Sequence, residues 1–379
     1  MTVRIWVLLL GCWLMSNCNT PSPQQQTTET QESSTIVERT GLYTNSFGLV
    51  IHAGAGFLKK ENVSDSMEAV YIAKLTEAIT AGHQVLEQGG TSLEAVKSCI
   101  NIMEDSPLFN AGKGAVFTHE GTNELDASIM EGQTLNAGAV AGVKRVKNPI
   151  NLAAEVMQNS KHVLLTGAGA EAFAQERGIE LIDPSYFYTP ALYQTLQNII
   201  KREEKAKAKK QEKEAAQTSS LDLDIYQNPF IKGAKFGTVG CVALDKNGNL
   251  AAGTSTGGMT NKRWNRIGDS PIIGAGTYAN NATCAVSCTG TGEYFMRSLV
   301  AYDISALMEY KGSTLKEATQ EVIQNKLKEL GGLGGVIALD KDGNVSMDFN
   351  TPGMHRAFMD DQGNLTIGLY QENFPTQTK

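Results

Sequence analysis

Three tight turns of one kind, each between two apolar runs, constrain the fold more than any other feature of this chain. They lie at 245–248, 340–343 and 360–363, and each begins with Asp and ends with Gly. Such a turn is typical of a β-hairpin, because Gly adopts the positive φ that the turn requires. The runs at 238–244 and 249–255 are therefore expected to pair as neighbouring antiparallel strands. A chain built from such hairpins favours layered sheets over a doubly wound parallel sheet.

Helical and strand-like patterns alternate in blocks along the rest of the chain. Helical periodicity covers 66–88 and ends at two glycines. Residues 91–94 form a capping box that opens a second helix, which extends to about Glu104. Further strands are expected at 47–52, 114–118, 125–130, 136–143, 162–166, 273–279 and 283–288, and further helices from Pro149 and at 168–177, 291–309 and 313–329. This order predicts sheets that are covered by helices.

The composition excludes several classes of protein. The 379 residues carry a net charge of −7, whereas a nucleic-acid-binding protein needs a basic surface that neutralises phosphates. The six cysteines include no Cys-x-x-Cys pair and have no His at zinc spacing, so buried free thiols are expected rather than a metal centre. The composition therefore favours a small-molecule substrate and no nucleic-acid partner.

The first 46 residues have the pattern of an export signal that is followed by a tether. Residues 1–18 place one positive charge before an apolar run that is too short to span a bilayer, and they end at Cys18. We interpret them as a lipoprotein signal, with Cys12 as a second candidate for lipidation and a plain secretory signal as the alternative. Residues 19–46 are expected to be a disordered tether. The protein is then exported, either periplasmic or anchored to a bacterial membrane through its lipid.

The clearest internal boundary lies between residues 200 and 237. Residues 201–214 carry mixed charges without an apolar face, which is typical of a solvated helix end or a disordered linker. The chain stays polar to Gly237, and an apolar strand begins directly at Thr238. A polar segment therefore delivers a Gly-Thr step to the first residue of a buried strand.

A cut at this step would create a nucleophile. If the bond between Gly237 and Thr238 is broken, Thr238 gains a free α-amino group next to its own hydroxyl. Such an amine titrates at about pH 7.7–8.0, which suits a general base that activates the hydroxyl. The Gly-Thr step alone is weak evidence, because an ordinary strand start has the same sequence.

Two downstream segments carry further polar and charged groups that could act together with Thr238. The loop after the strand at 249–255 contains several hydroxyls together with Arg266 and Asp269. Segment 288–293 opens a helix, where backbone N–H groups and hydroxyls suit a developing oxyanion. Each residue alone has an ordinary explanation: Arg266 and Asp269 fit a surface ion pair equally well, and His52 is expected to be structural. Only the joint pattern outweighs these ordinary explanations.

Taken in order, these motifs make the chain resemble the plant-type asparaginase/isoaspartyl peptidase family over residues 47–372. The matching stretches are 51–56, 109–112, 123–127, 237–240, 254–262, 266–271, 274–280, 287–293 and 349–353. The resemblance implies an α+β fold, the four-layer αββα sandwich of the Ntn hydrolases, which matures by autocleavage between Gly237 and Thr238. Residues 47–237, with a flexible linker at 200–236, would become the α-subunit, and 238–379 the β-subunit.

The resemblance also implies catalytic roles for individual residues. Thr238 would be the nucleophile, Thr256 would support it through a hydroxyl hydrogen bond, and Asn110 would lie nearby. Thr289 and Gly290 would form the oxyanion hole. No cofactor would be needed for catalysis.

The same resemblance implies how the substrate binds. Arg266 would pair with the substrate α-carboxylate and Asp269 with its α-ammonium, with Gly290 and Gly292 in the same site. A structural sodium would lie on backbone carbonyls of 101–108. The predicted reaction is hydrolysis of β-aspartyl dipeptides and of the side-chain amide of L-asparagine, giving L-aspartate. The predicted assembly is a dimer of processed αβ units.

Two alternatives and one departure from the family pattern accompany this prediction. A glycosylasparaginase would share the fold and the export, but such enzymes usually carry Asp-Thr at the cut, so Gly237 favours the isoaspartyl type. A non-catalytic, surface-anchored binding protein would have no need of Thr238 together with its partner threonines. Ala53 stands where the family usually has Gly in a His-Gly-Gly-Ala-Gly stretch next to the scissile bond.

Overall fold

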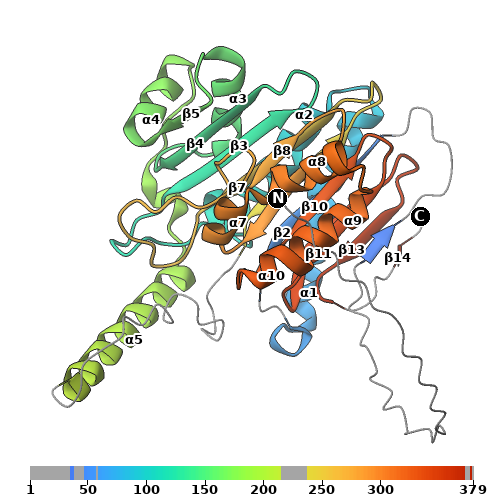
Figure 1. The fold of residues 1–379 in the computed structure, drawn as a ribbon. Helices are drawn as coiled ribbons and strands as arrows, with labels where there is room; N and C mark the ends of the chain where they lie inside the picture. Colours follow the sequence, from blue (N-terminus) through green and yellow to red (C-terminus); the bar gives the residue numbers. More distant parts are fainter. Residues whose placement is uncertain (1–34, 38–46, 57–58, 215–236, 372–375, 378–379) are drawn as a thin grey trace, which may run out of the picture. The chain divides into compact units, whose positions relative to one another are not determined.

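The structure, a computed structural model, describes residues 35–37, 47–56, 59–214, 237–371 and 376–377 (Figure 1). The predicted signal peptide and most of the predicted tether lie outside the described residues. Within the tether, β1 (Thr35–Val37) pairs antiparallel with strand β11 (Val345–Phe349) of the smaller sheet.

Nine strands form the larger sheet, in the order β14, β13, β12, β2, β6, β7, β3, β4, β5. Their bounds are β2 (Gly48–Gly56), β3 (Leu125–Glu131), β4 (Ala137–Val143), β5 (Leu164–Thr166), β6 (Val239–Leu244), β7 (Leu250–Thr256), β12 (Gly353–Met359), β13 (Leu365–Gly368) and β14 (Thr376–Gln377). Neighbours are antiparallel except β4 and β5. The hairpin predicted from 238 to 255 is confirmed as β6 and β7, which lie near the middle of the sheet.

The smaller sheet has the order β1, β11, β10, β9, β8 and is antiparallel throughout. Its remaining strands are β8 (Thr277–Ala279), β9 (Cys284–Gly290) and β10 (Gly334–Asp340). The turn at 340–343 joins β10 to β11, as predicted. Asp340 Oδ1 accepts the backbone N–H groups of Asp342 and Asn344 at 2.9 and 2.8 Å, which explains why Asp begins this turn.

Helices cover the outer face of each sheet (Figure 1). They are α1 (Asp65–Glu87), α2 (Ser92–Glu104), α3 (Pro149–Asn159) and α4 (Gly167–Glu176) beside the larger sheet, and α7 (Gly292–Ser298), α8 (Val300–Lys311), α9 (Leu315–Gln320) and α10 (Leu327–Glu329) beside the smaller. Short 3-10 turns lie at Lys60–Asn62, Gly112–Gly114 and Pro184–Phe187. The capping box predicted at 91–94 is confirmed at the start of α2.

Alternation along the strands separates the layers. In β6, Cys241 and Ala243 join the apolar cluster under the helices, whereas Val242 and Leu244 join the cluster between the two sheets. A third cluster lies between the smaller sheet and its helices. The predicted four-layer αββα sandwich is therefore confirmed.

The prediction of a strand at 114–118 is wrong. These residues follow the turn Gly112–Gly114 without joining either sheet. Side-chain amides take the place of a strand partner, because Asn110 Oδ1 accepts the Val116 N–H at 3.0 Å and Asn123 Nδ2 donates to two carbonyls of the segment. The apolar residues of this segment are buried, as they would be in a strand, which explains why the sequence pattern predicted one.

Two predicted helices are interrupted. The helix expected at 291–309 ends at Leu299, whose φ of 49° is left-handed, and restarts as α8. The helix expected at 313–329 contains a π-helical turn at Glu321–Lys326 between α9 and α10. Its start is as predicted, since Thr314 caps α9 with a capping box.

The charged segment before the predicted cut is helical as far as the structure describes it. It forms the second half of α5 (Pro190–Glu214), which extends away from the sheets in Figure 1. Leu192 and Leu196 near its start pack against Phe117. Residues 215–236 of the predicted linker lie outside the described residues.

Candidate active site

Thr238 lies directly before β6 and is buried, with 8% of its surface exposed. Its Oγ1 donates to Thr256 Oγ1, at the end of the neighbouring strand β7, over 3.1 Å. Gly237 packs closely on β2, because a Cβ at this position would lie 3.2 Å from both the Ala53 carbonyl oxygen and the Gly54 Cα. The strand pairing of β2, β6 and β7 therefore fixes the Gly-Thr step and its supporting hydroxyl.

Asn110 reaches the same place from the loop after α2. Its Nδ2 donates to the Gly258 carbonyl at 2.7 Å, and the Gly258 N–H donates to Thr256 Oγ1 at 3.0 Å. Asn110 thus holds the turn that completes the hydrogen bonds of Thr256. The structure brings Thr238, Thr256 and Asn110 into one connected group.

Thr289 and Gly290 end β9, in the sheet that faces β2 and β6. Thr289 is buried and its Oγ1 accepts the Ala55 N–H at 3.3 Å. Gly290 lies opposite Gly334 of β10, and a Cβ on Gly290 would come within 2.5 Å of the Leu333 carbonyl oxygen. Only a glycine fits this crowded strand end, directly after Thr289.

A second group of residues is charged. Arg266 Nε and Nη2 donate to the two oxygens of Glu293, each at 2.9 Å. Gly292 lies against this group, since a Cβ there would be 2.8 Å from both Arg266 Nη2 and Asp269 Oδ1. The predicted residues Arg266, Asp269 and Gly292 therefore meet, and Glu293 joins them without having been predicted.

Asp269 is a buried acid with one carboxyl oxygen that can still accept a hydrogen bond. Its Oδ2 finds no hydrogen-bond partner among the described residues. Burial raises the pKa of Asp269 to about 7, although the nearby Arg266 opposes the shift. A carboxylate in this state is stabilised by an incoming cation, such as a substrate ammonium.

Behind Thr238, a row of buried hydroxyls crosses between the sheets. His52 Nε2 contacts Ser287 Oγ at 3.0 Å, and the row continues through Thr254, Thr277 and Ser128 at 2.7, 2.5 and 2.8 Å, ending where Ser128 donates to the Ser270 carbonyl at 2.6 Å. Burial lowers the pKa of His52 to about 3, so its ring is neutral. The sequence predicted a structural role for His52, but the hydroxyl row that begins at its ring gave no local signal in the sequence.

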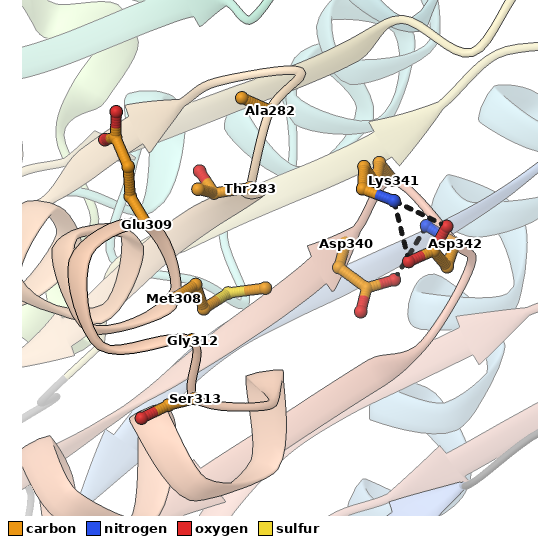
Figure 2. A pocket seen from close by; sticks show the side chains of 9 residues that line it. All are labelled: Ala282, Thr283, Met308, Glu309, Gly312, Ser313, Asp340, Lys341 and Asp342. Carbon is orange, nitrogen blue, oxygen red and sulfur yellow. Dashed lines mark hydrogen bonds and ion pairs between the residues drawn. The ribbon is translucent and has the colours of Figure 1, made fainter.

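The pocket in Figure 2 lies elsewhere. Its lining includes Thr283, directly before β9, Met308 of α8, and Asp340 at the hairpin end of β10. In the β9–β10 register, Asp340 is opposite Cys284, whereas Gly334 is opposite Gly290. The pocket is therefore at the far end of these strands from Thr289.

Within the described part of the chain, no cluster of three or more His, Cys, Asp or Glu side chains is placed to hold a metal ion. No helix in the described ranges combines the length and the apolarity that crossing a bilayer demands.

Known proteins resemble this chain over almost all of the described fold. It matches the asparaginase family over residues 45–369. It is 48% identical to an isoaspartyl peptidase of Salmonella typhimurium over 328 residues, which is 86% of this chain and 100% of the relative. It is also 46% identical to a putative isoaspartyl peptidase/L-asparaginase of Dictyostelium discoideum (82% and 92% covered), and 36% identical to an isoaspartyl peptidase/L-asparaginase of Danio rerio (87% and 97% covered). The chain therefore belongs to the asparaginase family of Ntn hydrolases, whose catalysis needs no cofactor.

Proposed function

We propose that this hydrolase cuts its own chain between Gly237 and Thr238 and then hydrolyses β-aspartyl dipeptides and the side-chain amide of L-asparagine, releasing L-aspartate. The observation that carries the proposal is the 3.1 Å hydrogen bond between the hydroxyls of Thr238 and Thr256, directly after Gly237. A threonine at an ordinary strand start needs no such partner. The names of the relatives support the substrate class.

In the self-cleavage step, the Thr238 hydroxyl attacks the carbonyl carbon of Gly237 and the C–N bond breaks, which gives an ester and a free α-amine. Water then hydrolyses the ester, so that Gly237 ends as a carboxylate and Thr238 keeps its hydroxyl. The close packing of Gly237 on Ala53 and Gly54 holds the peptide beside Thr256. Ala53 fits here because its φ is not positive, unlike that of Gly54 at 110°.

In turnover, the α-amine of Thr238 takes the hydroxyl proton and the hydroxyl oxygen attacks the substrate amide. The Thr289 hydroxyl and the Gly290 N–H would stabilise the oxyanion, since both are fixed at the end of β9. Ammonia or an amino acid leaves with a proton, and water hydrolyses the aspartyl ester. Thr238 is regenerated with its amine free.

The charged group suits the free L-aspartyl head of both substrates. Arg266 presents a planar guanidinium for the α-carboxylate, and the unpaired Asp269 oxygen would accept the α-ammonium. A peptide in ordinary α-linkage lacks one of these charges. The site thus favours β-aspartyl compounds over normal aspartyl peptides.

A structural sodium is compatible with the loop after α2. A Cβ on Gly112 would lie 2.3 Å from the Glu104 carbonyl oxygen, and one on Gly114 would lie 1.9 Å from that of Phe109. Both carbonyls lie close against the turn Gly112–Gly114, and carbonyl oxygens suit a hard cation. We propose that carbonyls of 101–108 and of the following turn bind sodium, which would stiffen the segment that carries Asn110.

The same proposal covers the parts of the chain that the structure does not describe. Residues 1–18 would export the protein, with Cys18 as the lipid anchor, and the processed α- and β-subunits would assemble as a dimer of αβ units. Intact mass of the purified protein, before and after lipase treatment, tests the anchor. Light scattering of the processed protein tests the dimer.

Intact mass and N-terminal sequencing after a day at neutral pH test the main proposal. Two chains, with the second beginning Thr-Val-Gly-Cys, are expected, and a Thr238→Ala variant should stay whole. Aspartate release should then be faster from a β-aspartyl dipeptide or L-asparagine than from a glycosylated asparagine. A wild-type chain that stays uncut would favour the non-catalytic binding protein, and faster release from the glycosylated compound would favour a glycosylasparaginase.

A further inference from the structure

We propose that Glu203 of α5 is a positioning residue that holds the substrate-binding loop 257–266 and keeps α5 attached to this loop after the chain is cut. The inference rests on the proposed function, because Glu203 would affect substrate binding through Arg266. It adds a residue from the predicted α-subunit to a site whose charged group lies in the predicted β-subunit.

Glu203 is a buried residue on an exposed stretch of helix. It is 6% exposed, whereas its neighbours Arg202 and Glu204 are exposed. Its Oε1 accepts a hydrogen bond from Asn261 Nδ2 at 2.6 Å, and its Oε2 accepts one from Arg263 Nη2 at 2.9 Å. Both carboxylate oxygens therefore bind the same loop, and these charge-assisted bonds offset the cost of burying the carboxylate.

The loop has a backbone that needs such support. Asn261, Trp264 and Asn265 have φ values of 66°, 55° and 54°, in a region that residues other than glycine seldom occupy. Trp264 is 90% exposed, so packing of its side chain does not fix this conformation. Contacts earlier in the loop must hold the backbone that leads into Arg266.

Asn261 is the centre of those contacts. Its N–H donates to the Phe117 carbonyl at 2.8 Å, and its Oδ1 contacts His119 Nδ1 at 2.8 Å. Phe117 in turn packs against the start of α5. The helix α5 therefore contacts the loop in two ways, directly through Glu203 and indirectly through the segment around Phe117. A cut between 237 and 238 breaks none of these contacts.

The sequence supplies a reporter for the loop. Its three tryptophans are Trp6, Trp13 and Trp264, so Trp264 becomes the sole tryptophan of a full-length chain that carries Trp6→Phe and Trp13→Phe. Glu203→Gln in this background is the test, because it removes the charge that binds Arg263. Glu204→Gln, an equal change on the exposed side of the helix, is the matched control.

We expect Glu203→Gln to lower the fluorescence anisotropy of Trp264, since a loosened loop moves on the nanosecond timescale. KM for a β-aspartyl dipeptide should rise about tenfold, as expected for the loss of a hydrogen bond to a charged group, with kcat changed much less. Glu204→Gln should change neither quantity. Arg263→Gln should loosen the loop from the other side, and the double variant should show less than the sum of the two effects.

The proposal is overturned if anisotropy and KM in Glu203→Gln equal those of the Glu204→Gln control, or if the effects of Glu203→Gln and Arg263→Gln simply add. Far-UV circular dichroism establishes that each variant is folded, and Arg263→Gln alone carries the test if Glu203→Gln does not fold. An uncut, inactive wild-type chain would contradict the proposed function. The anisotropy comparison would still decide whether Glu203 holds the loop.

Discussion

The two halves of the candidate site are built from different chemistry. Around Thr238, the hydroxyls of Thr238 and Thr256 are brought together by the pairing of two neighbouring strands, and the amide of Asn110 reaches this group from a loop. Around Arg266, charged side chains lie on loops and at a helix start. The first half should therefore depend mainly on the positions of neutral hydrogen-bonding groups, and the second half mainly on charge. Changes near Thr238 should lower kcat at any salt concentration, whereas changes near Arg266 should raise KM and respond to pH and salt.

The largest effect should come from Thr256→Val. Valine keeps the shape of the side chain but removes the partner of the Thr238 hydroxyl. By analogy with the loss of one fixed hydrogen bond at a reacting group, we expect self-cleavage and kcat to fall by about 10²–10³-fold, with KM unchanged. Mass spectrometry over time and steady-state kinetics measure both, with Thr366→Val on β13 as a control. An effect on KM alone would contradict the expectation that changes near Thr238 act on kcat.

A smaller effect is expected from the ionisation of Asp269. The pKa of this buried carboxyl is raised to about 7, and only the ionised form pairs with an ammonium. Below pH 7 the value of kcat/KM should therefore fall up to about tenfold per pH unit, beyond any effect of the Thr238 amine. Asp269→Asn should raise KM and remove this acidic inflection. An unchanged pH profile in Asp269→Asn would contradict the assignment.

Ionisation of Asp269 should favour substrate binding but lower the stability of the fold. Its pKa is higher in the folded than in the unfolded chain, so between about pH 4 and 7 the folded state holds more protons and stability falls as pH rises. Above pH 7, Asp269→Asn should stabilise the fold by up to roughly 2–4 kcal/mol. Chemical unfolding of an uncut Thr238→Ala background at pH 5 and pH 8 measures this difference. A loss of stability at pH 8 would mean that Asp269 is paired in the folded protein.

Glu293→Gln should produce a modest change. Glu293 binds the Nε and Nη2 edge of Arg266, and Nη1 stays outside this pair, so the carboxylate orients the guanidinium toward a substrate. The pair is partly solvated, since the Glu293 side chain is 47% exposed. We expect KM to rise about three- to tenfold and to depend less on salt concentration. Glu309→Gln on α8 is the control. A fall in KM would show instead that Glu293 competes with the substrate carboxylate.

The sequence predicted the neutral half of the site better than the charged half. Hairpins such as β6–β7 are local, so the pairing of the strands next to Thr238 and Thr256 followed from the pattern, whereas the role of Thr256 came from the family resemblance. The pairing of Arg266 with Glu293 and that of Asn261 with Glu203 each join a loop residue to a helix residue, 27 and 58 positions away in the chain. No periodicity specifies such contacts, because they depend on how the layers and loops meet.

The error at 114–118 has the same origin. Local sequence shows apolar residues that need burial and backbone groups that need partners, and a strand is the usual solution. Here Asn110 and Asn123 provide the partners from outside the segment. A side chain that replaces a strand is visible only in three dimensions, and Asn110 then serves both the segment and the site.

The smallest effect should come from Ser287→Ala, in the hydroxyl row behind Thr238. Ser287 bridges His52 and Thr254 at 3.0 and 2.7 Å, and Gly240 leaves room for it, since a Cβ there would lie 2.0 Å from Ser287 Oγ. Removing the hydroxyl deprives two buried groups of one partner, so stability should fall by about 1–2 kcal/mol. Because the row does not touch the Thr238 hydroxyl, kcat should change less than about twofold.

Urea unfolding in the Thr238→Ala background and kinetics of the processed enzyme separate these two quantities for Ser287→Ala. A loss of stability with unchanged kcat would make the row a support that holds the facing sheets together. A fall in kcat as large as that of Thr256→Val would instead extend the neutral half of the site across both sheets. The geometry-dominated region would then reach from Thr238 to the Ser270 carbonyl, next to Asp269, and the two halves would be coupled through hydroxyls rather than separate.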